Sequence, residues 1–439
     1  MDQLPSDRPG QREQQKTSGL PDFRTSGLPH GEPWDSGRAV AEVLLRAGHE
    51  TYAAGGCVRD LLLGRVVNDI DVATIAHPEQ VEALFAAHGW HTIAVGKAFG
   101  VVIVVTPAGQ NVEVATFRTD GAYIDGRRPA SVIYSTARED VERRDFTINA
   151  LLLDLHSGEV IDHVGGRADL AAGVVRAVGD AASRLREDRL RVLRGLRFCA
   201  RFAFTIEPTT WAAIVATPLT GLSGERLMQE LIKALEGPGR AQWLERLWQS
   251  GHLPGLCAPL ATVDVPALAT LGRRLDGLLA EDPLALRLAL WLSPLPLGPA
   301  KAWLTAQPLP TAVVRSVVWL LEQGRSLTDL SAQRLANRRR IWRHADGRWL
   351  GRLIPLLHDD PAQSEAVRTL MDELAQDLAK PWTPLIRADD LIALGLLPGP
   401  RLGALLRDIE DADLEGGFHD RAVALADARR RIADGGKPG

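Results

Sequence analysis

The sequence has few cysteines, no excess of basic residues and no long apolar segment. Its three cysteines (Cys57, Cys199 and Cys257) match no metal-ligand spacing and form no even disulfide set, which favours a reducing, cytoplasmic setting. No uncharged apolar run is long enough to cross a bilayer and the first residues lack a signal-peptide core, so we expect no membrane partner. A formal net charge of −4 means that any RNA contact must come from local Lys and Arg clusters.

The pattern along the 439 residues predicts an α+β protein, in which a small mixed-sheet head is followed by an all-helical remainder. Residues 1–34 are polar and rich in Pro, Gly, Gln and Arg, and we expect them to be disordered. After Asp169, long Ala/Leu/Arg segments with a period of 3.6 residues dominate. We therefore divide the chain into a disordered segment (1–34), a head (35–166), a helical neck (167–235), a helical body (236–350) and a helical tail (351–439).

Within the head, the hydrophobic period predicts the individual elements. A strand, a glycine turn, a helix and a second strand follow one another over residues 51–54, 55–56, 58–63 and 70–74. Residues 119–140 are polar and turn-rich and are predicted to form a mobile loop. The other predicted elements are helices over 37–47 and 77–88, strands over 101–105 and 111–117, and a hairpin over 151–154 and 159–164.

Asp69 and Asp71 flank Ile70 at the start of the second strand of this unit. Side chains two apart on a strand point to the same face, so the two carboxylates project together. Carboxylates held that close repel, and Mg²⁺ both removes the repulsion and prepares a phosphoryl centre. The pair is predicted to hold two catalytic Mg²⁺ ions, one that activates an attacking hydroxyl and one that stabilises the leaving group. A lone pair of this kind is more often a solvated turn, so the prediction depends on what precedes it.

Gly55 and Gly56 precede the pair and open the predicted helix. Backbone N–H groups at a helix N-terminus bind phosphate well where no Cβ intervenes, and Arg59 adds a cation. A lone Gly-Gly is usually a simple bend. A phosphate site followed by a two-carboxylate metal site, in this order and spacing, is the layout of a nucleotidyltransferase.

Four further blocks follow in the sequence. They are Arg143-Arg144-Asp145-Phe146-Thr147-Ile148-Asn149-Ala150-Leu151, Asp162-His163-Val164-Gly165-Gly166-Arg167-Ala168-Asp169-Leu170, Glu187-Asp188-Arg189-Leu190-Arg191 continuing to Arg194, Arg197 and Phe198, and Gly224-Glu225-Arg226 leading into Glu230-Leu231. Together with the glycine and aspartate motifs, they resemble the class II tRNA nucleotidyltransferases, which comprise CCA-adding enzymes and bacterial poly(A) polymerases. The resemblance covers residues 37–235 with high specificity and the remainder more faintly.

The resemblance implies a template-independent enzyme that adds CCA to the 3′ end of tRNA from CTP and ATP and releases pyrophosphate. It implies a third carboxylate at Glu113, although an ordinary exposed strand glutamate is nearly as good an interpretation. It also implies that Arg144, Asp145 and Asn149 line the nucleotide site and that Arg143 meets tRNA. Taken without the resemblance, Asp145 is a helix N-cap. The resemblance further implies that the helical tail binds the elbow of tRNA, as the tail of bacterial CCA-adding enzymes does.

Asp188 and the arginines after it form the second informative stretch. Arg191, Arg194, Arg197 and Arg201 lie three or four residues apart, so they share one helix face with Asp188. A carboxylate and a guanidinium together match the amine and ring nitrogen of cytosine and adenine, and mismatch uracil and guanine. Asp188 and Arg191 are thus predicted to select the base, as the family's amino-acid template does, and Arg194 and Arg197 to face phosphates. The alternative is a solvated charged face.

Three smaller features bear on RNA. Asp125-Gly126-Arg127-Arg128-Pro129 resembles a loop tied to accepting ATP after CTP, which argues against an enzyme that stops at CC. We assign Arg128 and Arg201, with Arg143, to RNA, and we expect Glu225 and Arg226 to brace the helix of Asp188. Arg338-Arg339-Arg340, Arg343 and Arg348 with two tryptophans are either a tRNA phosphate contact or, more often, a surface helix with core tryptophans.

The leading hypothesis is a full CCA-adding enzyme. A poly(A) polymerase is the nearest alternative, but Gly96-Lys97-Ala98-Phe99-Gly100-Val101 lacks the basic segment of such enzymes, and the net charge is slightly acidic. The sequence also leaves open the alternative that the protein is an enzyme that adds only the terminal A. A non-catalytic RNA-binding protein on the same scaffold is the alternative from another class, and the presence of Asp69 and Asp71 argues against it. The sequence gives no oligomeric state.

Overall fold

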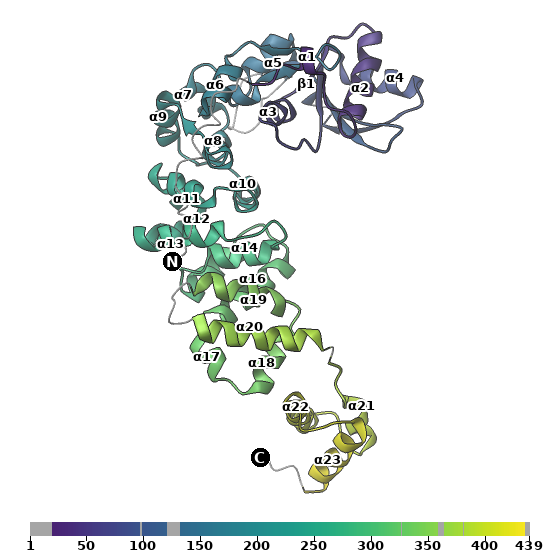
Figure 1. Cartoon of the computed structure of the whole chain (residues 1–439), viewed down its shortest axis with the longest axis vertical. Coiled ribbons are helices and arrows are strands. Elements are labelled where there is room, and N and C mark those ends of the chain that lie inside the picture. Colours follow the sequence, from purple (N-terminus) through teal and green to yellow (C-terminus); the bar gives the residue numbers. More distant parts are fainter. Residues whose placement is uncertain are drawn as a thin grey trace, which may run out of the picture. The chain divides into compact units, whose positions relative to one another are not determined.

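The computed structural model describes residues 20–96, 99–120, 132–325, 327–358, 364–380 and 382–434. The chain divides into two compact units, Met1–Leu256 and Cys257–Gly439. The first unit carries the sheet and the second is helical (Figure 1). The α+β class predicted from the sequence is confirmed.

A seven-stranded mixed sheet with the order β3-β4-β5-β2-β1-β8-β9 forms the centre of the first unit. Only β2 and β5 run parallel, in a register that pairs Asp71 with Glu113; the remaining neighbours are antiparallel. The strands are β1 Thr51–Ala54, β2 Asp71–Thr74, β3 His91–Gly96, β4 Val101–Val105, β5 Asn111–Thr116, β8 Leu151–Leu153 and β9 Val160–Asp162. This register places the acidic residues Asp71 and Glu113 opposite each other on neighbouring strands.

The two faces of this sheet follow from the alternation of side chains along each strand. Val72 and Val114 are buried in the larger core, which holds residues of α2 (Trp34–Arg46), α3 (Gly56–Leu62) and α4 (Pro78–Ala87). Ala73 faces the opposite way, into a smaller core with α5 (Ala137–Glu142). Asp71 and Glu113 have the parity of Ala73, so their carboxylates lie on the face with the smaller core.

The helices of the predicted neck (167–235) and the two helices after it complete the first unit. Gly195 of α8 is needed for close packing, since a Cβ there would lie 2.8 Å from Cζ of Phe146 in the head. Phe146 and Phe198 belong to the larger core, so head and neck share one interior. The elements are α6 Gly166–Ala172, α7 Ala181–Glu187, α8 Leu190–Phe202, α9 Pro208–Ala216, α10 Gly224–Glu236, α11 Arg240–Gln249 and α12 Leu253–Cys257, with β10 Val174–Val175 paired to β11 Thr205–Ile206.

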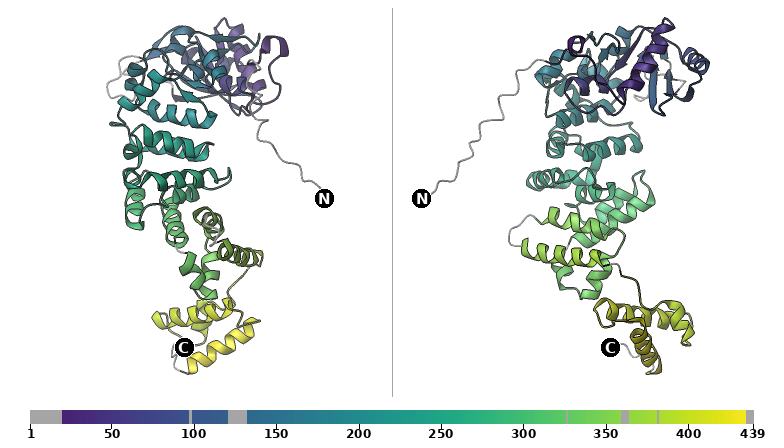
Figure 2. Two further views of the ribbon diagram at one scale, coloured as in Figure 1. Left: turned by 60° about the vertical axis from the view of Figure 1, so that its left-hand side comes forward. Right: turned by 45° about the vertical axis from the view of Figure 1, so that its right-hand side comes forward.

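Helices account for all the regular structure among the described residues of the second unit (Figure 2). A separate hydrophobic cluster gathers near its C-terminal end, around Leu391, Ile409 and Ala424. The elements are η3 Ala258–Thr262, α13 Val265–Asp276, α14 Leu284–Trp291, α15 Leu297–Thr305, α16 Thr311–Gly324, α17 Leu327–Ala332, α18 Leu335–Trp342, α19 Gly347–Leu357, α20 Ser364–Ala379, α21 Ala388–Ala393, α22 Pro400–Leu414 and α23 Arg421–Ala433.

Several sequence expectations need correction. The predicted disorder does not extend to residue 34, because α1 (Phe23–Ser26) forms and Phe23 packs against the head core; residues 1–19 lie outside the described residues. The predicted loop over 119–140 contains β6 (Arg118–Asp120) paired with β7 (Val132–Tyr134), and then α5. The boundary predicted after residue 350 falls inside α19. The finer division into neck, body and tail stays a prediction.

No single helix in the described part of the chain is both long enough and apolar enough to cross a membrane. One pair of consecutive segments, Leu253–Thr262 and Val265–Asp276, reaches that length and composition only when taken together, and it bends sharply between them.

Candidate functional site

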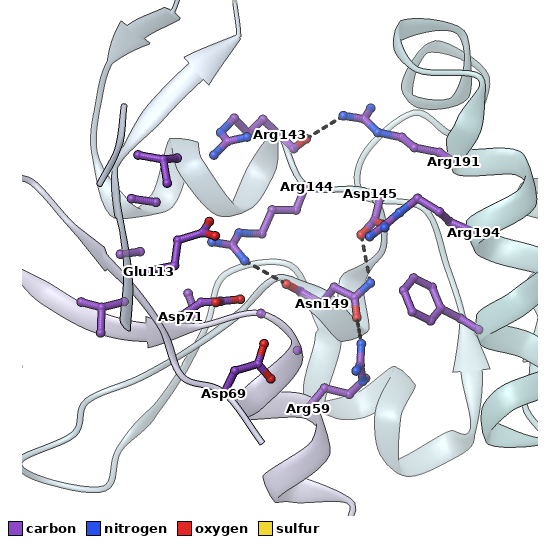
Figure 3. Close-up of a pocket in the computed structure, with 18 of the residues that line it drawn as sticks. Arg59, Asp69, Asp71, Glu113, Arg143, Arg144, Asp145, Asn149, Arg191 and Arg194 are labelled. Carbon is purple, nitrogen blue, oxygen red and sulfur yellow. Dashed lines mark hydrogen bonds and ion pairs between the residues drawn. The ribbon is translucent and has the colours of Figure 1, made fainter. Parts of the chain in front are cut away.

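A cavity of about 680 Å³ opens in the first unit, on the sheet face with the smaller core. Ala73, Ala115 and Val101 line its floor, and their small side chains leave room above the sheet. Figure 3 shows Asp69, Asp71 and Glu113 on one side of the cavity and Arg191 and Arg194 on the other, with the guanidinium of Arg144 close to Glu113. Of the site residues predicted from the sequence, those that line it are Gly55, Gly56, Arg59, Asp69, Asp71, Glu113, Arg143, Arg144, Asp145, Asn149, Asp188, Arg191 and Arg194.

Three carboxylates meet at the sheet edge of this cavity. Asp71 opens β2, Asp69 precedes it by two residues, and Glu113 lies beside Asp71 on β5. Burial, followed by the charges of Glu113 and Asp69, raises the pKa of Asp71 to about 6, against a smaller lowering by Arg144. The raised pKa shows that the carboxylates lie close enough to repel. Glu113 is thus part of the cluster.

The chemistry of this carboxylate cluster fits a divalent cation. In the described residues, no three His, Cys, Asp or Glu side chains form a complete metal-binding set. Mg²⁺ is usually held by one or two carboxylates together with water and substrate phosphates, so it needs no complete protein cage. Asp69 and Asp71 would supply the protein ligands, and a cation there would relieve the repulsion that raises the pKa of Asp71.

The raised pKa predicts how Asp71 affects stability in the absence of divalent ions. A carboxyl whose pKa rises from 3.8 to about 6 on folding lowers stability progressively as the pH rises between these two values, with the full cost above 6 and almost none below 3.8. Asp71→Asn should therefore raise the melting temperature in EDTA at pH 8 by about 2 °C, a modest gain because water partly screens the charges, and should leave it unchanged at pH 4. Millimolar MgCl₂ at pH 8 should stabilise the wild type more than the variant.

Thermal melts of Glu236→Gln provide the control for this prediction. Glu236 is an exposed carboxylate of the same unit outside the cavity, so its replacement should leave the melting temperature unchanged at both pH values. An equal gain for Asp71→Asn at pH 4 and pH 8 would mean that charge repulsion is not the cause.

The glycine turn brings the backbone close to the arginines that line the cavity, which we call the arginine wall: Arg59, Arg118, Arg143, Arg144, Arg191 and Arg194. Gly55 has φ +80°, and a Cβ there would lie 2.8 Å from Nη1 of Arg144, so this position requires glycine. The helix that follows, α3, has only seven residues, and it begins at Gly56 rather than at the predicted Val58. Charge at this end of the cavity therefore comes mainly from Arg144 and Arg59, not from a long helix dipole.

Asp145 connects the two walls of the cavity, and the prediction that it is a helix N-cap is wrong. One of its oxygens, Oδ1, accepts from Phe146 N at 2.8 Å and Asn149 Nδ2 at 3.0 Å, and Oδ2 accepts from Arg194 Nε at 2.8 Å. Burial raises the pKa of Asp145, but the charge of Arg194 and these hydrogen bonds outweigh burial and bring it below its ordinary value. Asn149 in turn accepts from Arg59, so Asp145 indirectly fixes a third basic side chain.

Asp188 and Arg191 both line the cavity, but they do not share a helix. Asp188 caps the C-terminus of α7 in an extended conformation, and α8 begins only at Leu190, so the predicted common face is broken. Oδ2 of Asp188 accepts from Arg226 Nη2 at 2.8 Å, which confirms that Arg226 braces this residue. Arg191 donates to Glu187 Oε2 at 2.7 Å and to two backbone carbonyls, of Arg184 at 2.7 Å and Arg143 at 3.3 Å.

The remaining predicted residues lie elsewhere. Arg197 does not line the cavity, since its side chain is 9% exposed and its Nε donates to Glu230 Oε2 at 2.7 Å; its predicted phosphate contact is therefore wrong. Arg201 is half-exposed at the end of α8, 3.9 Å from Asp60 and also outside the cavity. Arg128 and its loop, 121–131, lie outside the described residues.

Among the charged and aromatic residues that line the cavity, sequence reasoning assigned no site role to Arg118, Phe198 and Lys233. Phe198 follows Arg194 by four positions and Lys233 follows Arg226 by seven, so helical spacing alone could have placed both beside predicted site residues. The guanidinium groups of Arg59, Arg194 and Arg197 lie 5.3, 5.3 and 4.7 Å from the ring centre of Phe198. The ring therefore helps to hold the arginine wall in place.

Comparison with known proteins agrees with this geometry. Residues 51–176 match the poly A polymerase head domain family, and residues 203–260 match the family described as the probable RNA and SrmB-binding site of polymerase A. A CCA-adding enzyme of Geobacillus thermodenitrificans is 44% identical over 230 residues, 51% of this chain and 55% of the relative, so the chain spans about half the length of that relative.

Two longer matches extend the comparison. A CCA-adding enzyme of Streptococcus pyogenes is 33% identical over 385 residues, which cover 84% of this chain and 90% of the relative. The crystal structure of the Bacillus stearothermophilus CCA-adding enzyme in complex with CTP superposes with a TM-score of 0.75 at 29% identity, covering 92% of this chain and all of that one. The chain therefore belongs to the family of CCA-adding enzymes, which are nucleotidyltransferases that share their head domain with poly(A) polymerases.

Proposed function

We propose that the protein adds the 3′-terminal CCA to tRNA, using CTP and ATP with Mg²⁺ and releasing pyrophosphate without a nucleic-acid template. The observation that carries the proposal is a cavity in which three carboxylates face a wall of arginines. Membership in the CCA-adding family and the likeness to a relative bound to CTP support it. Because the proposed substrates are tRNA, CTP and ATP, we also propose that the protein is located in the cytoplasm.

The carboxylates define the reacting end of the proposed site. Asp69 and Asp71 would hold two Mg²⁺ ions, with Glu113 beside Asp71 as a third carboxylate. Such ions, when bound, would lower the pKa of an attacking 3′-hydroxyl and stabilise charge on the leaving pyrophosphate. The three carboxylates also repel phosphate, so they disfavour a triphosphate at this end of the cavity unless a cation is bound.

The triphosphate lies along Gly55 and Gly56 in this proposal, with the guanidinium groups of Arg59 and Arg144 as its counter-charges. Both arginines are already oriented by protein partners. Arg144 donates to Asp140 Oδ2 at 3.0 Å and to Asn149 O at 3.3 Å, and Arg59 donates to Asp60 at 2.9 Å. Side chains fixed before the substrate binds lose little entropy when they contact phosphate. Arg194, fixed by Asp145, adds a further cation.

Base selection falls to Asp188 and Arg191. Each oxygen of Asp188 accepts one hydrogen bond, from Leu190 N at Oδ1 and from Arg226 at Oδ2, and a carboxylate has about four acceptor positions. Arg191 makes three bonds to described residues and has five N–H donors. Both groups can therefore contact a base while keeping their protein partners. Cytosine and adenine each offer an amine beside a ring nitrogen, whereas uracil and guanine place a carbonyl oxygen opposite Asp188.

Asp188→Ala should relax the choice among the four nucleotides by roughly 10- to 100-fold, the discrimination of one bidentate pair. The measurement is single-nucleotide incorporation with each triphosphate under identical conditions. Arg226→Ala is the matched control, because it breaks the same ion pair but leaves the Asp188 carboxylate in the cavity. This control should transfer more slowly while keeping its preference for C and A. Equal loss of selectivity in both variants would show that the pair, and not Asp188, selects the base.

The RNA side of the proposal involves Arg143 at the cavity and Arg201 outside it, together with Arg128 in the loop outside the described residues. Arg143 is oriented by Asp140 Oδ1 at 2.6 Å and by Arg118 O at 2.8 Å. We assign to these arginines the positioning of the tRNA 3′ end, because they are the predicted RNA contacts in the same unit as the nucleotide cavity.

Extension of three tRNA transcripts tests the proposed function. The transcripts end at the discriminator base, at C and at CC, and each is incubated in Mg²⁺ with CTP, ATP, both, or UTP and GTP. Extension of the first transcript to CCA and no further is the expected result. Extension of the CC-ended transcript alone would instead identify an A-adding enzyme, and an unbounded ladder of A a poly(A) polymerase. Binding of tRNA without any extension would leave only a non-catalytic RNA-binding protein.

A further inference from the structure

Asp140 is a buried carboxylate next to two arginines of the nucleotide cavity, and the proposed chemistry gives it no direct part. It lies on α5, is 2% exposed and does not itself line the cavity. A capping box fixes the start of this helix, where Thr136 Oγ1 accepts from Glu139 N at 3.3 Å. A buried carboxylate is costly unless cations and hydrogen bonds compensate its charge, so the partners of Asp140 indicate its role.

The two oxygens of Asp140 each hold one arginine of the cavity. Oδ1 accepts from Arg143, from Nη2 at 2.6 Å and from Nε at 3.0 Å. Oδ2 accepts from Arg144, from Nη2 at 3.0 Å and from Nε at 3.3 Å. The backbone N–H of Arg118 also donates to Oδ1, at 3.4 Å. Each guanidinium thus makes a two-point contact with the carboxylate, which fixes its plane as well as its position.

The spacing along the chain explains how consecutive arginines reach one carboxylate. Arg143 and Arg144 follow Asp140 by three and four positions, and residues at both spacings lie on the same side of a helix. Their other contacts then differ, because Arg144 Nη1 donates to Asn149 O at 3.3 Å and Arg143 Nε donates to Arg118 O at 2.8 Å. Asp140 is therefore the shared contact of two side chains that serve different parts of the cavity.

The charges of this group still favour an anion in the cavity. Burial raises the pKa of Asp140, but the charges of Arg144 and Arg143 and their hydrogen bonds outweigh burial and bring it below its ordinary value, so the carboxylate is ionised. One negative charge against two guanidinium groups leaves one positive charge, which attracts phosphate. The side chains of both arginines are 20% exposed and line the cavity, so their pairing with Asp140 does not remove them from it.

We propose that Asp140 is a positioning residue for both substrates, which holds Arg144 toward the triphosphate of the incoming nucleotide and Arg143 toward the 3′ end of the RNA. The inference rests on the proposed function for the assignment of the two arginines. It goes beyond that function in giving two binding steps to one buried carboxylate that touches neither substrate. An arginine that is ordered before it binds loses less conformational entropy on contact, which is worth roughly three- to tenfold in affinity for each substrate.

The test measures the binding of each substrate separately in the full-length variant Asp140→Asn, which keeps the shape of the side chain and removes its charge. CTP binding is measured by equilibrium dialysis in MgCl₂ without RNA, and binding of a short hairpin RNA ending in CC by fluorescence anisotropy without nucleotides. Both affinities should fall by roughly three- to tenfold. Affinity for CMP, which lacks the β and γ phosphates, should fall less than affinity for CTP. Arg144→Ala should weaken the binding of CTP alone, and Arg143→Ala that of the hairpin alone.

Double variants separate positioning from a general structural effect. In the Arg144→Ala background, Asp140→Asn should cause no further loss of CTP affinity, because the side chain through which Asp140 acts on the nucleotide is absent. In the Arg143→Ala background, it should cause no further loss of hairpin affinity. Losses that add in both backgrounds would overturn the inference, since a structural defect would not depend on which arginine is present.

Asp427→Asn is the matched control. Asp427 is a buried carboxylate of α23 and, like Asp140, pairs with the arginines three and four positions later, Arg430 at Oδ1 and Arg431 at Oδ2. It belongs to the second unit and does not line the nucleotide cavity, so its replacement disturbs the same arrangement away from the proposed nucleotide site. Its affinities for CTP and for the hairpin, which lacks the tRNA elbow, should match those of the wild type.

Lysine variants test the inference even if Asp140→Asn does not fold. Arg144→Lys and Arg143→Lys keep the positive charge but lose the planar two-point contact with the carboxylate, so each should weaken the binding of its own substrate by roughly three- to tenfold. Wild-type affinities in both lysine variants, or a loss in Asp140→Asn confined to one substrate, would overturn the inference. Absence of nucleotide transfer by the wild type, with these changes in affinity observed, would refute the proposed function alone.

Discussion

Replacing Asp71 with alanine is expected to lower nucleotide transfer by at least about 10³-fold, a loss of roughly 4 kcal/mol of transition-state stabilisation. Asp71 interacts with both other carboxylates of the cluster, since the charges of Glu113 and Asp69 each raise its pKa. Alanine removes one of the two proposed Mg²⁺ ligands and leaves the arginine wall untouched. The measurement is the single-turnover rate of A addition to CC-ended tRNA, with tRNA affinity determined in parallel.

Affinity for tRNA should change less than about threefold in this variant, because the proposed RNA contacts are arginines, which the substitution leaves in place. Glu236→Ala is the control, an exposed carboxylate of the same unit that does not line the cavity, and it should transfer at the wild-type rate. Survival of transfer in Asp71→Ala within about tenfold of the wild type would remove Asp71 from the reacting centre. A matching loss of tRNA affinity would assign it to binding.

Glu230→Ala is expected to destabilise the neck by about 3–5 kcal/mol, the cost of leaving one member of a buried ion pair uncompensated. The Arg197 and Glu230 side chains are 9% and 4% exposed, and Nε lies 2.7 Å from Oε2. A chain with two compact units need not unfold in one step. The effect should therefore be measured as faster hydrogen exchange of the amides of α8 and α10, which the pair joins.

Two variants distinguish the charge effect from the loss of packing. The double variant Arg197→Met, Glu230→Leu removes both charges and fills the space with apolar atoms, so it should recover most of the protection. Glu42→Ala breaks the exposed pair with Arg46, and because the side chains of Arg46 and Glu42 are 79% and 59% exposed, it should cost less than about 0.5 kcal/mol. A double variant as unstable as Glu230→Ala would attribute the destabilisation to shape.

Local pattern predicted the parts of the site that depend on neighbours in the sequence. The strand period placed Asp69 and Asp71 together, and the glycine pair marked a turn that has φ +80° at Gly55. The third carboxylate, Glu113, needed the parallel register of β2 and β5 to become more than an exposed glutamate. Strand pairing between segments this far apart in the chain follows from the fold as a whole, and no short motif encodes it.

The partners of Asp145 and Arg197 were missed for a related reason, whereas the bracing of Asp188 by Arg226 was predicted. The partner of Asp145 is Arg194, 49 positions away; that of Asp188 is Arg226, 38 away; and that of Arg197 is Glu230, 33 away. Each residue had a plausible local role: Asp145 as an N-cap, Asp188 on a shared helix face, and Arg197 on a phosphate-facing stripe. Buried charges take whichever partner compensates them, because leaving them unpaired costs several kcal/mol, and that partner is chosen by tertiary packing.

The adjacency of Asp145 and Phe146 has a consequence for protein engineering. Asp145 holds Arg194, and Phe146 packs on Gly195, so two consecutive head residues meet two consecutive neck residues. In a chimera with the head of one relative and the neck of another, the contacts of Asp145 with Arg194 and of Phe146 with Gly195 would be lost unless both pairs came from the same relative. Transplanting base preference between family members thus requires moving this four-residue junction as a single cassette along with Asp188 and Arg191.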